Sequence, residues 1–443
     1  MQTRAQSEIF ATVPVLRSGM VRRPVNQMPL IVSRRMPEVS SLVRLAFAAF
    51  VFSILFEEIP IGIPVESTQI TGSLLVFAVL LLQPRTLLQR VPGALWCFII
   101  YFILGIAILL TNDSFFDDEV LSRQFKFIQL LVLFWISYVL MRDERVAREA
   151  LLSLIASCLL LSLLQIFGLT ITTEFADSRL ARFTAFGLDS NHLAGVLSLG
   201  LLAAVGFAYE KKRHKTLLLP LVIPVCAFIG ITIVKTGSRG GLLALAFGLL
   251  VLLLAKGSLS SKVRNIFVGV SLFAFFGWIA YQSEIVKGRF QHSWEDGSLS
   301  GREQIYPMAW QMFLEKPLAG WGPVTNSVEL GNRLQLYGYD RMDPHNLVLY
   351  VLTATGLVGA LPFLTGIFLC VRTAWRSRIG PHGIIAFALT VSLLTAELSV
   401  TGFHWKHHWI ILAYALATGA YLNGFRGKPV LITLTGHSRS VSS

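Results

Sequence analysis

The sequence predicts an all-α polytopic membrane protein of about twelve transmembrane helices with one long loop outside the membrane. Hydrophobic residues make up 54% of the 443-residue chain and charged residues only 14%, and the mean hydropathy is +0.64. These values are typical of membrane proteins. Apolar segments follow one another along the chain, and only one polar stretch, Glu284 to Pro344, is long enough to hold structure of its own.

The apolar segments define the predicted helices in order. The first two, at 45–56 and 70–83, are short for a hydrocarbon core of about 30 Å. The others lie at 93–111, 124–141, 149–168, 191–209, 216–234, 241–255, 265–282, 346–371, 383–402 and 407–424. No internal repeat is visible, so the sequence gives no support to the inverted repeats found in many transporters.

Charge placement predicts the orientation of this bundle. With both termini on the cytoplasmic side, the inner segments hold 25 of the 38 Lys and Arg and the outer segments hold 13, as the positive-inside rule requires. The expected organisation is a basic, disordered cytoplasmic tail (1–44), helices one to nine (45–282), a periplasmic loop (283–344), helices ten to twelve (345–424) and a cytoplasmic tail (425–443). The first forty residues lack a long apolar core, so we expect no cleaved signal peptide.

Composition also excludes several function classes. The net charge of +13 is dispersed over short loops and the N-terminal tail, which argues against nucleic-acid binding. The four cysteines all fall in apolar spans, where they indicate packing residues and neither a disulfide framework nor a metal site. Neither a phosphate loop nor a dinucleotide fingerprint occurs. An enzyme of this shape would therefore use an activated substrate that reaches it through the membrane.

The polar stretch carries a predicted helix. Ser300 and Glu303 have the spacing of a capping box, and an apolar stripe follows at i, i+3, i+4, i+7 and i+8, with Pro307 in the first turns. Arg302 then lies in the first helical turn, where the helix dipole disfavours a cation. A ligand phosphate or a nearby acid such as Glu303 would compensate for this placement, although an ordinary exposed arginine is also compatible with the pattern. The stripe consists of Ile305, Met308, Ala309, Met312 and Phe313.

The next helix is predicted to begin at Asp343-Pro344-His345-Asn346, with Asp343 as N-cap and Pro344 in the first helical position. The positive end of a helix disfavours a charged imidazole, so His345 would stay neutral and able to accept a proton. The alternative is a solvated polar anchor at the membrane surface. Asp189-Ser190-Asn191-His192 repeats the design before the sixth span and places a second outward histidine near Arg182.

A third outer arginine lies in the tight connection Thr236-Gly237-Ser238-Arg239-Gly240-Gly241. The connection is so short that Arg239 must lie at the membrane surface or point into a cavity. It could contact lipid headgroups, as membrane arginines commonly do, or bind a pyrophosphate with its planar fork of donors. His404 and His408 in the last outer turn have a spacing that could bind a metal, but an aromatic-flanked interface turn is the favoured interpretation and we expect no metal.

Taken in order, these segments resemble the O-antigen ligase family, whose related members include O-antigen and exopolysaccharide polymerases. The resemblance covers roughly residues 40–424 and is most specific in the second half. The matching segments are Phe186 to Ala194, Thr236 to Gly241, Ser300-Gly301-Arg302, Gly320-Trp321-Gly322, Asp343 to Asn346 and Thr355 to Gly359.

The resemblance implies a GT-C-like inner-membrane glycosyltransferase with a periplasmic site and no metal, nucleotide or other cofactor. It implies a glycan on undecaprenyl pyrophosphate as donor and a glycan or lipid A-core as acceptor, with other polysaccharide export proteins as further partners. By motif position, Arg239 and Arg302 would bind the pyrophosphate and His345 would act as the base. Arg182 is a softer match, which Arg179 could replace, and Asn191 and His192 are further substrate-binding candidates.

Two other classes stay open at this point. A multi-span transporter or a flippase of lipid-linked glycans would need ionisable groups near the middle of the membrane, where Glu397 is the main exception in nearly uncharged spans. A peptidoglycan polymerase would share the lipid donor, but its characteristic loop pattern is not apparent. Ligase and polymerase differ only in their acceptor, which the sequence does not show.

Overall fold

In the computed structural model the described residues are 38–57, 66–111, 116–169, 184–186, 188–210, 215–254, 301–334, 341–380 and 382–426, together with single positions between 260 and 282. Every regular element among them is a helix. The elements are α1 (Ser41–Ser53), η1 (Ile54–Phe56), α2 (Ser67–Leu82), η2 (Pro84–Thr86), α3 (Gly93–Thr111), α4 (Asp118–Met141), α5 (Glu144–Ile166), α6 (Ser190–Glu210), α7 (Lys215–Lys235), α8 (Arg239–Leu254), α11 (Arg302–Glu315), α12 (Thr325–Leu334), α13 (Leu347–Ser377), α14 (Gly383–Ala396), η3 (Gly402–His404) and α15 (Lys406–Arg426).

The predicted all-α membrane bundle is confirmed, and its helices coincide closely with the predicted spans. Five helices, α3, α4, α5, α6 and α13, are long and apolar enough to cross a membrane, and shorter apolar helices accompany them. The span predicted at 265–282 lies outside the described residues, apart from isolated positions. The number twelve and the orientation therefore stay predictions.

The core of the bundle is aromatic. Phe98 of α3, Phe134 of α4, Phe363 of α13 and Trp409 of α15 are fully buried, and the ring of Phe98 meets the other three edge to face with centroids 5.0–5.6 Å apart. Inside a membrane the lipid is as apolar as the side chains, so tight packing of this kind is what holds helices together. The indole nitrogen of Trp409 donates to the carbonyl of Phe403 at 2.7 Å, which anchors η3 on this core.

Glycines bring α6 and α8 into close contact. A Cβ atom on Gly241 would lie 2.4 Å from the Cβ of Ala194, and one on Gly248 would lie 2.3 Å from Leu202. Small residues at such crossings are typical of membrane helices. As a result the first turn of α8, which contains Arg239, lies directly beside the first turn of α6.

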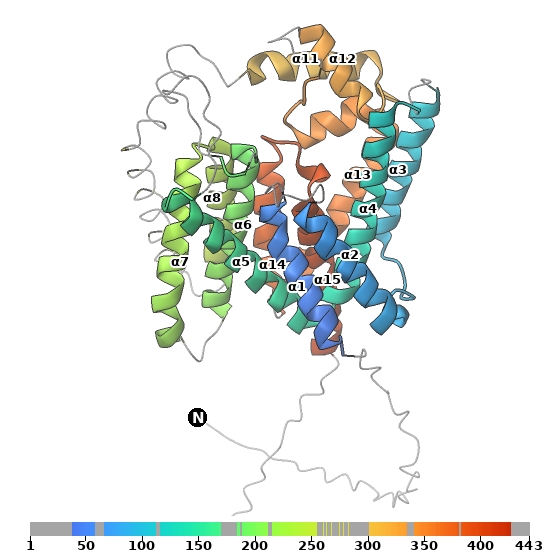
Figure 1. Cartoon of the computed structure of the whole chain (residues 1–443). Coiled ribbons are helices and arrows are strands. Elements are labelled where there is room, and N and C mark those ends of the chain that lie inside the picture. Colours follow the sequence, from blue (N-terminus) through green and yellow to red (C-terminus); the bar gives the residue numbers. More distant parts are fainter. Residues whose placement is uncertain are drawn as a thin grey trace, which may run out of the picture. The chain divides into compact units, whose positions relative to one another are not determined.

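Figure 1 shows α11 and α12 at one end of the bundle, which we call the α11 end. The apolar stripe predicted for α11 is confirmed, because Ile305, Ala309, Met312 and Phe313 are buried and the helix packs on α13. The predicted capping by Ser300 is not what the structure describes: the N-cap is Gly301, with a left-handed backbone and no side-chain hydrogen bond, and Ser300 lies outside the described residues.

Arg333 joins α12 to α11. Its Nη1 and Nη2 donate to the two carboxylate oxygens of Glu315 at 2.7 and 2.6 Å, and its Nε donates to Glu329 at 2.7 Å. A paired, two-point contact of this kind is the strongest geometry that arginine and carboxylate can form. Arg333 is therefore a structural residue of the loop.

A break in α13 connects this loop to the bundle. Gly356 has a φ of 57° inside the helix, and the freed backbone groups bond to the segment after α11. Trp321 N donates to the carbonyl of Thr353, and Leu357 N donates to the carbonyl of Pro317, both at 2.8 Å. The two glycine motifs at 320–322 and 355–359 are therefore parts of one contact. We call the backbone hydrogen bonds between residues 317–322 and the break in α13 the interlock.

Candidate functional site

The candidate site centres on the connection between α14 and α15 (Glu397–Trp405), at the α11 end. Two carbonyls of this connection accept hydrogen bonds from other elements. Arg302 Nη2 donates to the carbonyl of Ser399 at 2.6 Å, and Tyr306 Oη, one turn further along α11, donates to that of Leu398 at 3.1 Å. The contact of Arg302 is to a neutral group, so it positions the guanidinium without neutralising its charge.

The first turn of α8 reaches the same connection. A Cβ on Gly240 would lie 2.0 Å from Ser399 Oγ, so only glycine allows this approach. Arg239, which precedes it, begins α8 and is partly buried. Ser238 Oγ accepts from Gly241 N at 3.1 Å and donates to Asn191 Oδ1 at 2.9 Å. The structure therefore brings Arg239, Arg302 and Asn191 to one region.

His345 lies beside the same connection. Tyr306 Oη is 3.4 Å from the carbonyl of His345, and Asn346 Nδ2 donates to the carbonyl of Leu398 at 3.3 Å. The imidazole is 40% exposed, and its Nδ1 lies 3.8 Å from Asp343 Oδ1. That distance is too long for a hydrogen bond.

The prediction that Asp343 caps α13 and that His345 lies in its first turn is wrong. The N-cap is Asn346, whose Oδ1 accepts from Val348 N and Leu349 N. Asp343 Oδ1 instead accepts from His345 N and Thr401 Oγ1, both at 2.6 Å. His345 precedes the helix with a φ of 50°. Residues other than glycine rarely adopt this backbone conformation, and those that do are enriched at functional sites.

Asp189 does cap α6 as predicted, since its Oδ1 accepts from Asn191 N at 2.8 Å and His192 N at 3.1 Å. His192 is buried at 8% exposure. Its ring stacks on Trp405 with centroids 3.5 Å apart, and its Nε2 lies 3.4 Å from His407 Nδ1. His192 thus lines a small pocket with Asn191, Glu397 and His407. Arg182 and Arg179 lie outside the described residues.

The structure adds a buried contact between a carboxyl group and a histidine that motif analysis missed. Glu397 pairs with His408 Nδ1, and both side chains are at most 2% exposed. The carbonyl of Glu397 also accepts from Leu347 N, the first residue of α13, at 3.0 Å. The sequence signal for this pair was the single carboxylate in an otherwise uncharged span, but its partner could not be read from spacing.

Two further contacts brace the α11 end. Lys406, at the start of α15, forms an ion pair with Glu57, which follows η1. Burial raises the pKa of Glu57, but the charge of Lys406, its hydrogen bond and smaller contributions from Glu66 and Lys126 together lower the pKa overall. Arg341 pairs with Glu119 of α4. These cations have carboxylate partners, as Arg333 does.

His404 does not join His408 in a metal site in the described structure. Its ring stands edge-on to Tyr350 at 5.4 Å, and the described residues contain no group of three or more metal-ligating side chains. Burial lowers the pKa of His404 to about 3, and the positive charges of Arg123 and Lys126 act in the same direction. The imidazole is therefore neutral at ordinary pH.

The apolar helices indicate a multi-pass membrane protein. The basic groups that gather at one end of its bundle form a polar site there. The comparisons show that the chain is similar to O-antigen ligases. The O-antigen ligase family model matches residues 224–364. The chain is also similar to an O-antigen ligase of Pseudomonas aeruginosa, with 28% identity over 255 residues, which are 56% of this chain and 59% of that relative.

The resemblance predicted from the motifs is therefore confirmed. The match spans less than two thirds of the relative's length. The region that the family model covers includes Arg239, Arg302 and His345, the same residues that converge on the α14–α15 connection.

Proposed function

We propose that this protein transfers a glycan from undecaprenyl pyrophosphate to a hydroxyl of an acceptor sugar, at the periplasmic face of the bacterial inner membrane. The observation that carries the proposal is the convergence at Leu398 and Ser399. Arg302 donates to the carbonyl of Ser399, and the α8 turn that contains Arg239 packs against the same residue. Asn346, which follows His345, donates to the carbonyl of Leu398. The similarity to an O-antigen ligase supports the same assignment.

The two arginines suit the leaving group. As the bond between the anomeric carbon and the pyrophosphate oxygen breaks, the bond electrons stay on the pyrophosphate and its negative charge grows. A guanidinium that is already fixed in place stabilises such charge without reorganisation. The hydrogen bond to Ser399 orients Arg302 while leaving its other donors directed elsewhere.

His345 suits the acceptor. Its exposed imidazole takes the proton of the attacking hydroxyl, whose oxygen forms the new bond to the anomeric carbon. Asp343 lies 3.8 Å from Nδ1 and stabilises the imidazolium that results. Attack opposite the leaving group inverts the configuration at the anomeric carbon. Because the arginines take up the charge, the proposed reaction needs no metal ion.

Deletion of the gene tests this function. Lipid-linked glycan should accumulate, and surface glycans separated on a gel should change. Loss of capped lipopolysaccharide would identify a ligase with a lipid A-core acceptor, whereas loss of a secreted polymer or of ladder length would identify a polymerase. Unchanged surface glycans together with normal levels of lipid-linked donor would contradict the proposal.

A further inference from the structure

Three consecutive carbonyl groups, those of residues 397–399, each accept a hydrogen bond from the segments that carry Arg302 and His345. The donors, in the order of these carbonyls, are Leu347 N at 3.0 Å, Asn346 Nδ2 at 3.3 Å and Arg302 Nη2 at 2.6 Å. Asn346 and Leu347 are the two residues that follow His345. The distance between Arg302 and His345 therefore depends on where residues 397–399 lie.

The side chain of Glu397 connects this segment to α15. It is 2% exposed, and its carboxyl group contacts Nδ1 of His408, which is fully buried. The carboxyl group also lies against Gly402, where an added Cβ atom would be 2.6 Å from Oε1 of Glu397. Because Gly402 has no side chain, the carboxyl group fits in this position.

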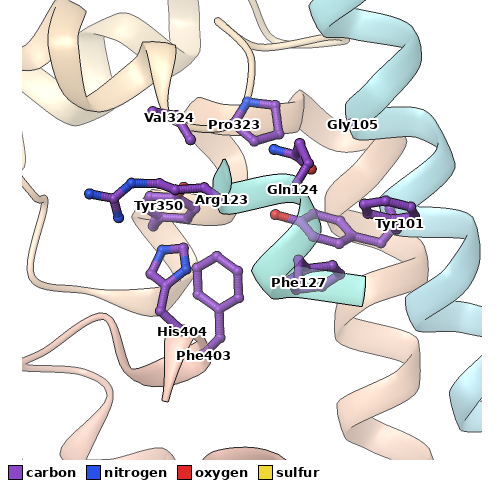
Figure 2. Close-up of a pocket in the computed structure, with 11 residues that line it drawn as sticks. Tyr101, Gly105, Arg123, Gln124, Phe127, Pro323, Val324, Tyr350, Phe403 and His404 are labelled. Carbon is purple, nitrogen blue, oxygen red and sulfur yellow. The ribbon is translucent and has the colours of Figure 1, made fainter. Parts of the chain in front are cut away.

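The residues next to Gly402 are held by the aromatic core. The ring centroid of Phe403 lies 4.9 Å from that of Tyr350 and 5.9 Å from that of Phe127. Figure 2 shows these three side chains together. Closely packed interiors of this kind yield little to displacement. Glu397 therefore connects the carbonyls that hold the site to a well-fixed part of the bundle.

Stability alone does not account for the contact between Glu397 and His408. The second carboxyl oxygen of Glu397 and Nε2 of His408 are buried and have no hydrogen-bond partner among the described residues. Burying polar atoms without partners costs free energy, and replacing a buried polar pair by apolar side chains is often neutral or stabilising. Ionisable groups inside a membrane bundle commonly serve a function.

We propose that Glu397 and His408 are positioning residues for the proposed reaction. Their contact fixes residues 397–399, whose carbonyls set the distance between Arg302, assigned to the leaving group, and His345, assigned to the acceptor. Neither Glu397 nor His408 touches a substrate. The inference rests on the proposed function and adds two residues that act through the groups already assigned.

An apolar double variant separates positioning from stability. Glu397→Leu/His408→Phe removes both polar groups with little change in volume, so neither buried group is left without the other. Glu144→Leu is the matched control, because Glu144 lies 3.4 Å from Nε2 of the buried His382 at the opposite end of the bundle. Melting temperature and kcat are measured in lipid nanodiscs. The donor is lipid-linked glycan extracted from the deletion strain, and the acceptor is lipid A-core or the same lipid-linked glycan.

We expect the double variant to melt close to the wild-type temperature while its kcat falls by about 10²-fold, the effect of a displacement of roughly 1 Å that originates away from the reacting atoms. Glu144→Leu should keep the wild-type kcat. Gly402→Ala pushes on the carboxyl group without removing it, so it should lower kcat as well. This variant keeps the test decisive if the double variant does not fold.

Two further measurements distinguish positioning from other roles. The amide oxygen of Glu397→Gln can still accept a hydrogen bond from His408, so this variant should retain most of the wild-type kcat. Adding His345→Gln to the double variant should cost much less than it costs in wild type, because effects that act through one group are not additive.

A wild-type kcat in the double variant or in Gly402→Ala would overturn the inference. Fully additive effects with His345→Gln would also overturn it, as would a loss of kcat that only follows a loss of folded protein. A Glu397→Gln protein as inactive as the double variant would contradict a positioning role, since it would indicate proton transfer by Glu397 itself. Failure of the proposed function has a different signature, namely no transfer by wild type.

Discussion

At the scale of single residues, the cations at the α11 end differ in what they contact. Arg333, Arg341 and Lys406 each form an ion pair with a carboxylate of the protein. Their charge is therefore neutralised within the fold. Arg302 instead donates to a backbone carbonyl, a neutral partner, which is compatible with the proposed binding of the donor pyrophosphate. This difference could not be predicted from the sequence, in which all of these residues are cations in outer segments.

Replacing Arg302 tests whether its planar fork binds the donor. Arg302→Lys keeps the charge but loses the two-point geometry, so transfer should fall by about 10²–10³, the usual effect of losing one preorganised donor. Arg378→Lys is the matched control, because Arg378 also donates to a carbonyl, that of Trp375 at 2.8 Å, at the other end of the bundle. Transfer and membrane abundance are measured together. Full activity of Arg302→Lys would rule out the assigned role.

His404 makes stability depend on pH. Its pKa is about 3 in the folded protein against 6.5 for the free side chain. The unfolded state therefore binds the proton first, and the stability contribution is complete above pH 6.5 and is lost as pH falls toward about 3. The melting temperature in detergent should drop between about pH 7 and pH 4.5, and less so in His404→Gln. Identical drops in both proteins would contradict the assignment.

At the scale of elements, the interlock between residues 317–322 and the break in α13 explains two glycine motifs. The motifs could be listed from the sequence, but their pairing could not, because each glycine serves a backbone partner more than thirty residues away. A Cβ on Gly320 would lie 2.6 Å from the carbonyl oxygen of Thr353, and one on Gly356 would lie 2.3 Å from that of Leu318. Both approaches exclude a side chain.

Gly356→Ala should therefore destabilise the protein markedly. The positive φ alone costs on the order of 1–3 kcal/mol, and the added methyl would overlap the backbone of Leu318. Gly93→Ala in α3 is the control, because the added methyl would meet only Leu369 at 3.7 Å. Thermal unfolding in detergent should show a clear loss for Gly356→Ala and almost none for Gly93→Ala. Equal melting temperatures would show that the interlock does not support the fold.

The two predicted helix caps show why local patterns are an incomplete guide. Asp189 and Asp343 begin segments of similar composition, yet only Asp189 caps its helix. Asp343 is drawn to Thr401, 58 residues away, and Asn346 replaces it as cap. The local spacing allows either residue to cap the helix, and it carries no information about the tertiary hydrogen bond to Thr401.

At the scale of the whole molecule, apolar periodicity predicted nearly all the helices that the structure describes. The convergence of α8, α11, α13 and the α14–α15 connection was implied only through the family resemblance. The contacts that create it, such as Arg302 with Ser399 and His408 with Glu397, link residues that no spacing rule relates. The arrangement of charges in the sequence did predict which end of the bundle would carry them, and the orientation of that end in the membrane stays a prediction.

Reporter fusions test this orientation. Fusions after Arg213 and Arg376 should report a cytoplasmic location, and a fusion near Gly331 in α12 should report a periplasmic one, because inner segments hold 25 of the 38 Lys and Arg. The two sets of fusions control for each other. A cytoplasmic result at Gly331 would place the candidate site on the wrong side of the membrane for a periplasmic glycan.

The most direct test of the central claim is a paired measurement on purified His345→Gln, which compares glycan transfer with retention of the lipid-linked donor. Glutamine keeps a polar side chain but cannot take a proton, so transfer should fall by about 10²–10⁴ while donor retention stays at the wild-type level, since Arg239 and Arg302 are intact. A metal chelator should change neither quantity. Transfer by His345→Gln at a rate near that of wild type would contradict the assignment of His345 as the base.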